Sequence, residues 1–213
     1  SIAVLDGLNE NGELDESSDF NPKIDHSAYA ISKHFSEMEV WRASAEGLNT
    51  VIVNPGLIIG SGNWNESSGT LFKELGENSY TFSGGTSYVD VRDVAKISVE
   101  LMENNIFGER FILISENKKY EEIANFIKQK LGKSATKIIP NGLLKVGVFL
   151  NTILGWLISP LKMANKVNVQ SVTEFNKISN KKIKEKLNYQ FITVEESLAF
   201  HLENYKKDRS FNK

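Results

Sequence analysis

The sequence predicts an α/β fold in which a parallel sheet carries a mostly helical lobe. In the first half of the chain, strand-like segments alternate with helical ones, as expected for parallel strands joined by helices. The run at residues 50–53 is rich in β-branched side chains, which is typical of a parallel strand buried on both faces. From Gly142 onward the pattern is almost entirely helical, and this indicates the lobe.

The amino-terminal segment leads into the first clear helix. Residues 1–5 read as the end of a buried strand, and residues 6–25 form a polar loop. Asp25 or Ser27 can cap the helix that follows, and Gly47 is suited to end it.

The same helix has an apolar stripe at helical spacing. Its members are Ile31, Phe35 and Met38.

The strand at residues 50–53 ends in a stretch that we expect near a ligand. Asn54, Pro55 and Gly56 break the strand pattern at its carboxyl end. In open α/β sheets, ligands lie outside the carboxyl ends of the strands, so residues 54–59 are candidates for ligand contacts. The excursion over residues 60–85 is unusually long for a compact domain, which favours a functional role. We expect one helical piece within it, at residues 69–75.

The remaining elements follow in order. We expect a strand at residues 88–91, a helix capped by Asp93 and running to Met102, a strand at 110–114, an amphipathic helix at 120–131, and closing helices at 183–189 and 194–205.

Composition narrows the function classes. The chain of 213 residues is 40% hydrophobic and 24% charged, which is ordinary for a soluble globular protein. Its net charge is −2 and it has no block of Lys and Arg set among aromatics, so we expect no nucleic-acid partner. It has no cysteine, which excludes a disulfide scaffold and thiolate metal sites and suits the cytoplasm. His26 and His34 lack the spacing of a metal site, so we expect no metal.

Targeting signals are not evident. The first residues lack the pattern of a signal peptide and read as a start inside a longer protein. The longest apolar run, residues 146–158, is interrupted by Asn151 and Thr152 and closed by Pro160. It is too short to cross a bilayer, so we expect a packed helix and no membrane partner; a helix facing a membrane surface or another protein is the alternative.

The strongest chemical signal is the pair Tyr29 and Lys33. Four residues apart on a helix, they share one face. An ammonium group beside a phenol favours the phenolate form, and a phenol so tuned can exchange a proton with a carbonyl or an alcohol. Such a group belongs beside a nicotinamide hydride carrier. The alternative is an exposed Tyr and a solvated Lys on a surface helix.

Several stretches in the expected order resemble the extended short-chain dehydrogenase/reductases, the NAD-dependent epimerase/dehydratase family. They are residues 1–4 (the strand-end serine stretch), 29–33 (Tyr-x-x-x-Lys), 54–60 (the Asn-Pro strand end), 88–95 (a late strand-to-helix signature) and 187–189 with the final helix. Within the family, the tail looks most like the dihydroflavonol-reductase-like branch. The family's Gly-rich pyrophosphate turn has no counterpart here, so the chain looks like the carboxyl-terminal part of such an enzyme.

This resemblance implies an architecture. We expect the carboxyl-terminal portion of a Rossmann-type parallel sheet in residues 1–60 and 86–115. The substrate-binding lobe and closing helices then occupy residues 61–85 and 116–213.

The resemblance also implies roles for individual residues. Tyr29 is the general acid/base, Lys33 binds the nicotinamide ribose, and Ser1 orients the substrate carbonyl or alcohol. The stretch Pro55, Gly56, Leu57 and Ile58 would pass beside the nicotinamide of NAD or NADP; ending the strand is its structural alternative. Asn54 and Tyr88 are candidate substrate contacts.

The function expected from the resemblance is hydride transfer between NAD(P) and a carbonyl or alcohol carbon. The substrate is a small molecule, either a nucleotide sugar or a small ketone or aldehyde. We expect the fragment alone to be inactive, and a homodimer through the helix that bears Tyr29 and Lys33 is possible. The alternative is a non-catalytic dinucleotide-binding or scaffold protein on the same fold.

Overall fold

The computed structural model describes residues 1–154 and 165–211, which form two compact units. The first unit holds residues 1–69, 87–117 and 177–213, and the second holds residues 70–86 and 118–176. The sequence suggested that residues 61–85 and 116–213 form the substrate-binding lobe and the closing helices. Residues from Lys177 onward, which include those closing helices, cluster with the first unit.

The first unit is built on parallel strands. Strand β1 (Val51–Pro55) pairs with β5 (Glu109–Leu113), and β2 (Leu57–Ile59) pairs with β4 (Gly85–Asp90), both in parallel. Strand β6 (Glu116–Lys119) follows β4 on its other side. The predicted parallel sheet is therefore present.

Residues of β5 alternate between two apolar clusters, because successive side chains of a strand point to opposite faces. Phe111 and Leu113 belong to the cluster with Val89 and Ile97, while Ile112 belongs to the other. The strand is thus buried on both faces, as its sequence indicates.

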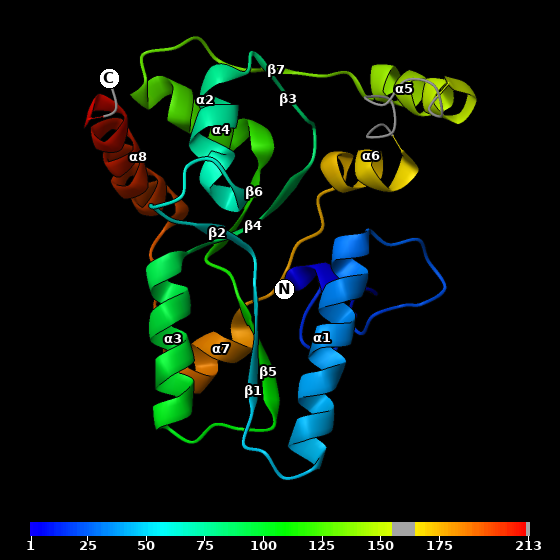
Figure 1. Ribbon diagram of the computed structural model, residues 1–213, viewed down its shortest axis with the longest axis vertical. Coiled ribbons are helices and arrows are strands. Elements are labelled where there is room, and N and C mark those ends of the chain that lie inside the picture. The colour runs from blue at the N-terminus through cyan, green and yellow to red at the C-terminus, as the bar shows by residue number, and fades with distance from the viewer. Residues whose placement is uncertain (155–164, 212–213) are drawn as a thin grey trace. The chain divides into compact units, whose positions relative to one another are not determined.

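Helices cover both sides of these strands (Figure 1). Figure 1 shows α1 (Ala28–Ala45, blue) on one side of β1 and β5, with α3 (Val91–Glu103) and α7 (Lys181–Leu187) on the other. The last helix, α8 (Val194–Phe211), contacts β2. Two short 3₁₀ helices, η1 (Ile2–Val4) and η2 (Ser67–Thr70), are also present.

The second unit is mostly helical. Its helices are α2 (Leu71–Glu77), α4 (Tyr120–Lys130), α5 (Asn141–Leu154) and α6 (Lys166–Thr173). The short strands β3 (Tyr80–Thr81) and β7 (Lys137–Ile138) pair in parallel. Helix α2 packs on α4, and α5 packs on α6.

Three local predictions are wrong. Residues 2–4 form η1 rather than a strand end, because the Ser1 hydroxyl accepts a hydrogen bond from the Ala3 amide. Asp90, not Asp93, caps α3, since its carboxylate accepts from the Arg92 amide at 2.8 Å.

The third concerns the apolar run at residues 146–158. Its first part lies in α5, which is helical as predicted and packs on α6, but the Val146 and Phe149 side chains are exposed rather than buried. Residues 155–158 of this run lie outside the described residues.

Candidate active site

Tyr29 and Lys33 lie on the first two turns of α1. The Ser27 hydroxyl caps this helix by accepting a hydrogen bond of 3.2 Å from the Ala30 amide, which fixes where the helix begins. The Tyr29 side chain is 57% exposed, and Lys33 is exposed as well. Both groups are therefore open to a ligand.

The three residues expected to be catalytic lie together. The Tyr29 hydroxyl lies 3.3 Å from the Ser1 Oγ and donates a hydrogen bond to it. The Lys33 Nζ lies 5.7 Å from the centroid of the Tyr29 ring. This arrangement joins a phenol, a cation and a second hydroxyl at one place on the surface.

Asn54 holds Ser1 beside α1. Its side chain is fully buried at the carboxyl end of β1, and its Nδ2 donates to the Ser1 carbonyl oxygen at 3.1 Å and to the Glu37 Oε2 at 2.9 Å. These bonds connect the strand end, the helix and Ser1. A direct contact between Asn54 and substrate stays a prediction.

Glu37 is a residue that the sequence analysis missed. Its side chain is 8% exposed, and its carboxylate accepts hydrogen bonds from Asn54, from Trp41 Nε1 (3.4 Å) and from Arg110 Nη1 (3.2 Å). Buried carboxylates need such partners, because burial without them is costly. Glu37 therefore fixes α1 against the strands, and with it the position of Tyr29.

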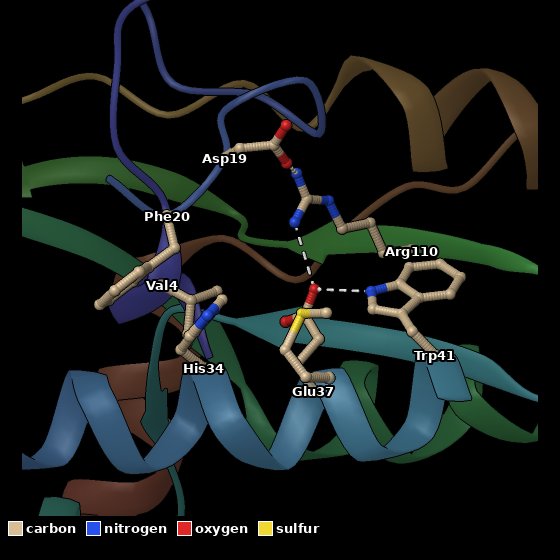
Figure 2. A pocket seen from close by; sticks show the side chains of 8 residues that line it. Val4, Asp19, Phe20, His34, Glu37, Trp41 and Arg110 are labelled. Atoms are coloured by element: carbon tan, nitrogen blue, oxygen red, sulfur yellow. Dashed lines mark hydrogen bonds and ion pairs between the residues drawn. The ribbon is translucent and has the colours of Figure 1, made fainter. Parts of the chain in front are cut away.

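A pocket of about 250 Å³ lies on the side of α1 that faces the strands (Figure 2). Its lining residues are Val4, Asp19, Phe20, His34, Glu37, Met38, Trp41 and Arg110.

Aromatic stacking and an ion pair shape this pocket. The Phe20 ring stacks on the His34 ring with 4.1 Å between centroids, and Asp19 lies 2.9 Å from Arg110. Figure 2 shows the Arg110 side chain reaching both Asp19 and Glu37. Neither Tyr29 nor Lys33 lines the pocket, so it is distinct from the predicted catalytic group.

The stretch from Pro55 to Ile58 leads from β1 into β2, and its residues are half-buried. The Gly56 amide donates to the Leu113 carbonyl oxygen at 3.1 Å. A Cβ at Gly56 would lie 2.4 Å from the Ser87 carbonyl oxygen, so only glycine fits here without displacement. Contact of this stretch with the nicotinamide stays a prediction.

The other predicted substrate residue, Tyr88, is fully buried in β4. Its contact with substrate also stays a prediction.

A second polar cluster surrounds Asp90. The buried Asp90 carboxylate accepts hydrogen bonds from Arg92 (2.7 Å) and Ser197 (2.6 Å), and the His201 Nε2 lies 3.3 Å away. The Ser61 Oγ lies 2.6 Å from the His201 Nδ1. This chain of contacts ties the loop after β2 to α8.

Burial and hydrogen bonding set the protonation of this cluster. Burial opposes ionisation of Asp90, but the hydrogen bonds from Arg92 and Ser197 outweigh it and lower its pKa to about 2. Burial lowers the pKa of His201. At neutral pH the cluster therefore holds a charged carboxylate and a neutral imidazole.

Asp93 lies near this cluster but has different partners. It accepts from the Tyr189 hydroxyl at 2.9 Å and from the Ile192 amide at 3.0 Å. Burial raises the pKa of Asp93.

No group of three or more His, Asp or Glu side chains in residues 1–154 and 165–211 could hold a metal ion. None of the helices described there is both long and apolar enough to cross a bilayer.

Known proteins share this fold and parts of this sequence. "Sterol demethylase protein B" of Methylococcus capsulatus is 26% identical over 129 residues, which are 59% of this chain and 39% of that protein. The crystal structure of gox2253 is 22% identical, with a TM-score of 0.83 over 98% of this chain and 64% of that one.

Two further structures carry a cofactor. The dTDP-glucose 4,6-dehydratase of Bacillus anthracis, in complex with NAD, is 14% identical with a TM-score of 0.71 over 99% of this chain and 61% of that one. RMD of Pseudomonas aeruginosa, complexed with NADPH, is 13% identical with a TM-score of 0.63 over 97% of this chain and 64% of that one.

These likenesses confirm the predicted fold class. This chain spans less than two thirds of the length of each of these proteins. The finer assignment to the dihydroflavonol-reductase-like branch stays a prediction. Residues 6–113, half of the sequence, match the profile of one family, and the chain belongs to this NAD dependent epimerase/dehydratase family.

Proposed function

We propose that the full-length protein transfers hydride between NAD(P) and a carbonyl or alcohol carbon, with Tyr29 as the general acid/base. The observation that carries the proposal is the contact between the Tyr29 hydroxyl and the Ser1 Oγ, with Lys33 beside the Tyr29 ring. Membership of the family supports it.

The chemistry of Tyr29 and Lys33 fits the nicotinamide end of the cofactor. Tyr29 and Lys33 are exposed and supply a hydroxyl and an ammonium for the nicotinamide ribose. The sequence has no Gly-rich turn between a strand and a helix, the arrangement that binds a pyrophosphate. We therefore expect little dinucleotide affinity from residues 1–213 alone, which calorimetry with NAD and NADP would check.

Tyr29 transfers the proton to or from the substrate oxygen. Bound nicotinamide would supply the hydride to the carbonyl carbon or accept it from the alcohol carbon. During reduction, the Tyr29 hydroxyl gives its proton to the carbonyl oxygen, and the product is an alcohol. During oxidation, the Tyr29 phenolate takes the alcohol proton.

Ser1 and Lys33 assist in different ways. The Ser1 hydroxyl lies next to the Tyr29 hydroxyl and can donate a hydrogen bond to the same substrate oxygen. Lys33, whose Nζ lies 5.7 Å from the centroid of the Tyr29 ring, would bind the nicotinamide ribose. Asn54 contributes by holding Ser1 in place.

For the substrate, we propose a nucleotide sugar or a small ketone or aldehyde. The dTDP-glucose dehydratase among the structural neighbours supports the first of these. We keep a cytoplasmic location as a prediction.

The test is Tyr29→Phe in the full-length protein, which removes one hydroxyl. We expect turnover to fall by about 10²- to 10⁴-fold, the usual contribution of a general acid/base. The matched control is Tyr80→Phe, because Tyr80 is 56% exposed and lies on β3 of the second unit.

Two results would contradict the proposal. One is unchanged turnover of the Tyr29→Phe variant. The other is cofactor binding by the full-length protein without oxidation or reduction of any candidate substrate, which would indicate the scaffold alternative.

A further inference from the structure

Helix α5 of the second unit presents its apolar side outward. Leu143, Val146, Phe149 and Leu150 are 63%, 51%, 64% and 39% exposed. Residues three, four and seven apart lie on one face of a helix, so these four side chains form one surface, which we call the α5 face.

The opposite side of α5 is the less exposed one. Leu144, Gly147, Val148 and Asn151 are half-buried there, and the helix packs against α6 (Figure 1). A helix of a globular protein normally turns its apolar stripe inward. In the part of the chain that the structure describes, the α5 face is instead the more exposed side of this helix.

The second unit is basic, although the whole chain is slightly acidic. Its two segments hold ten Lys and five Glu and no Asp or Arg, a net charge of +5, against −2 for the chain. Between residues 123 and 173 the sequence has Lys but neither Asp nor Glu. Lys137, Lys145 and Lys166 in this stretch are exposed.

We propose that the α5 face docks on the surface of a bilayer that contains anionic phospholipid. Leu, Val and Phe are side chains that enter the acyl boundary, and lysines attract acidic headgroups. The second unit contains both the exposed apolar side chains and the lysines. The interaction is peripheral, in agreement with the lack of a spanning helix among residues 1–154 and 165–211.

A protein partner fits the α5 face less well. The residues that contribute most to protein interfaces are enriched in Trp, Tyr and Arg and poor in Leu and Val, and three of the four residues of this face are Leu or Val. The absence of acidic residues over residues 123–173 favours an extended negative surface as the occupant. This proposal replaces the expectation, from the apolar run alone, that no membrane partner exists.

The experiment is flotation of the full-length protein with two kinds of vesicle. One kind is pure phosphatidylcholine, and the other contains about 30 mol% phosphatidylglycerol to supply negative charge. We expect binding to the anionic vesicles, much weaker binding to the neutral ones, and loss of binding at about 0.5 M salt, which screens the lysines.

The variant is Val146→Ser combined with Phe149→Ser, which removes apolar area without changing charge. We expect its fraction bound to anionic vesicles to fall by about tenfold or more, because both side chains would leave the acyl boundary. The matched control is Leu8→Ser combined with Leu48→Ser, since both residues are exposed (56% and 62%) but lie in the first unit. An unchanged melting temperature would show that each variant is folded.

Three outcomes would overturn the proposal. The first is no binding of the wild-type protein to anionic vesicles, and the second is equal binding of the wild-type protein and the α5 variant. The third is a change in oligomeric state of the α5 variant with no vesicle binding by the wild type, which would identify the α5 face as a protein interface. None of these depends on catalysis, so the proposed function stands or falls separately.

Discussion

The side-chain amide of Asn54 donates a hydrogen bond of 2.9 Å to the carboxylate of Glu37, and both side chains are buried. This bond joins the carboxyl end of β1 to the middle of α1. The same amide group also holds the Ser1 carbonyl oxygen. The position of Ser1 beside α1 therefore depends on two buried polar side chains, those of Asn54 and Glu37.

The first prediction concerns Glu37→Gln in the full-length protein. The neutral side chain leaves the mostly buried guanidinium of Arg110 without its charged partner on α1. We expect the free energy of unfolding to fall by about 2 kcal/mol, in the range measured for hydrogen bonds to charged groups. Urea unfolding measures this change.

The control for this prediction is Glu39→Gln on the same helix. Glu39 pairs with Arg42 at 2.8 Å, but both side chains are more than 60% exposed. Exposed pairs contribute little, so we expect a change below about 1 kcal/mol. Equal effects of the two substitutions would show that burial of Glu37 does not matter.

The second prediction concerns Gly56→Ala. The new Cβ would lie 2.4 Å from the Ser87 carbonyl oxygen and 3.0 Å from the Ile114 Cγ2, so strands would have to move apart. We expect a loss of about 1–3 kcal/mol in unfolding free energy, the usual cost of overpacking. Thermal or urea unfolding checks it.

Gly142→Ala is the matched control for Gly56→Ala. A Cβ at Gly142 would meet no atom within 4 Å, and the residue lies in α5. Because alanine favours helix, this variant should be as stable as the wild type or slightly more stable. A similar loss in both variants would contradict the steric argument.

The elements of the site that neighbouring residues in the sequence determine were predictable. The helix over Tyr29 and Lys33 follows from the cap at Ser27 and the turn at Gly47, which has φ +100°. The strand at β1 follows from its β-branched residues. These signals are local, so one sequence contains them.

The residues that fix the site could not be found in this way. Glu37 bonds to Asn54, which is 17 residues away, and to Arg110, which is 73 residues away. Periodicity instead pointed to Ile31, Phe35 and Met38, which are 40%, 64% and 48% exposed. A polar residue becomes a core residue through distant partners, and hydrophobic patterns do not reveal such partners.

The third prediction concerns pH and His201. Burial lowers the pKa of this imidazole in the folded protein below its ordinary value near 6.5. As pH falls through that value, the unfolded chain binds a proton that the folded protein does not, so the folded state loses stability. The full-length protein should therefore unfold more easily at about pH 5.5 than at about pH 8.

The groups that face His201 do not cancel this effect. Asp90 attracts a proton to the ring and Arg92 opposes it, yet burial dominates. Asp90 has a pKa of about 2 and stays charged over this pH range. We expect His201→Gln to flatten the dependence of unfolding free energy on pH. An equal slope in the variant and the wild type would assign the dependence to another group.

The fourth prediction concerns the exposed apolar stripe of α1. Ile31, Phe35 and Met38 form an exposed apolar stripe on the helix that carries Tyr29 and Lys33, which supports the proposed homodimer through this helix. Phe35→Asp would place a charge in such a contact, where burial of an unpaired charge is costly. We expect the full-length protein to be a dimer by light scattering. The dissociation constant of the variant's dimer should be higher by about tenfold or more.

The stability of the folded subunit should not change in Phe35→Asp, because the Phe35 side chain is 64% exposed within one chain. Leu48→Asp is the control, since Leu48 is similarly exposed but lies beyond the end of α1. A monomeric wild-type protein, or a Phe35→Asp variant that dimerises as tightly as the wild type, would exclude α1 as the dimer contact. The apolar stripe would then need another partner, because exposed apolar groups on one helix face are costly to leave in water.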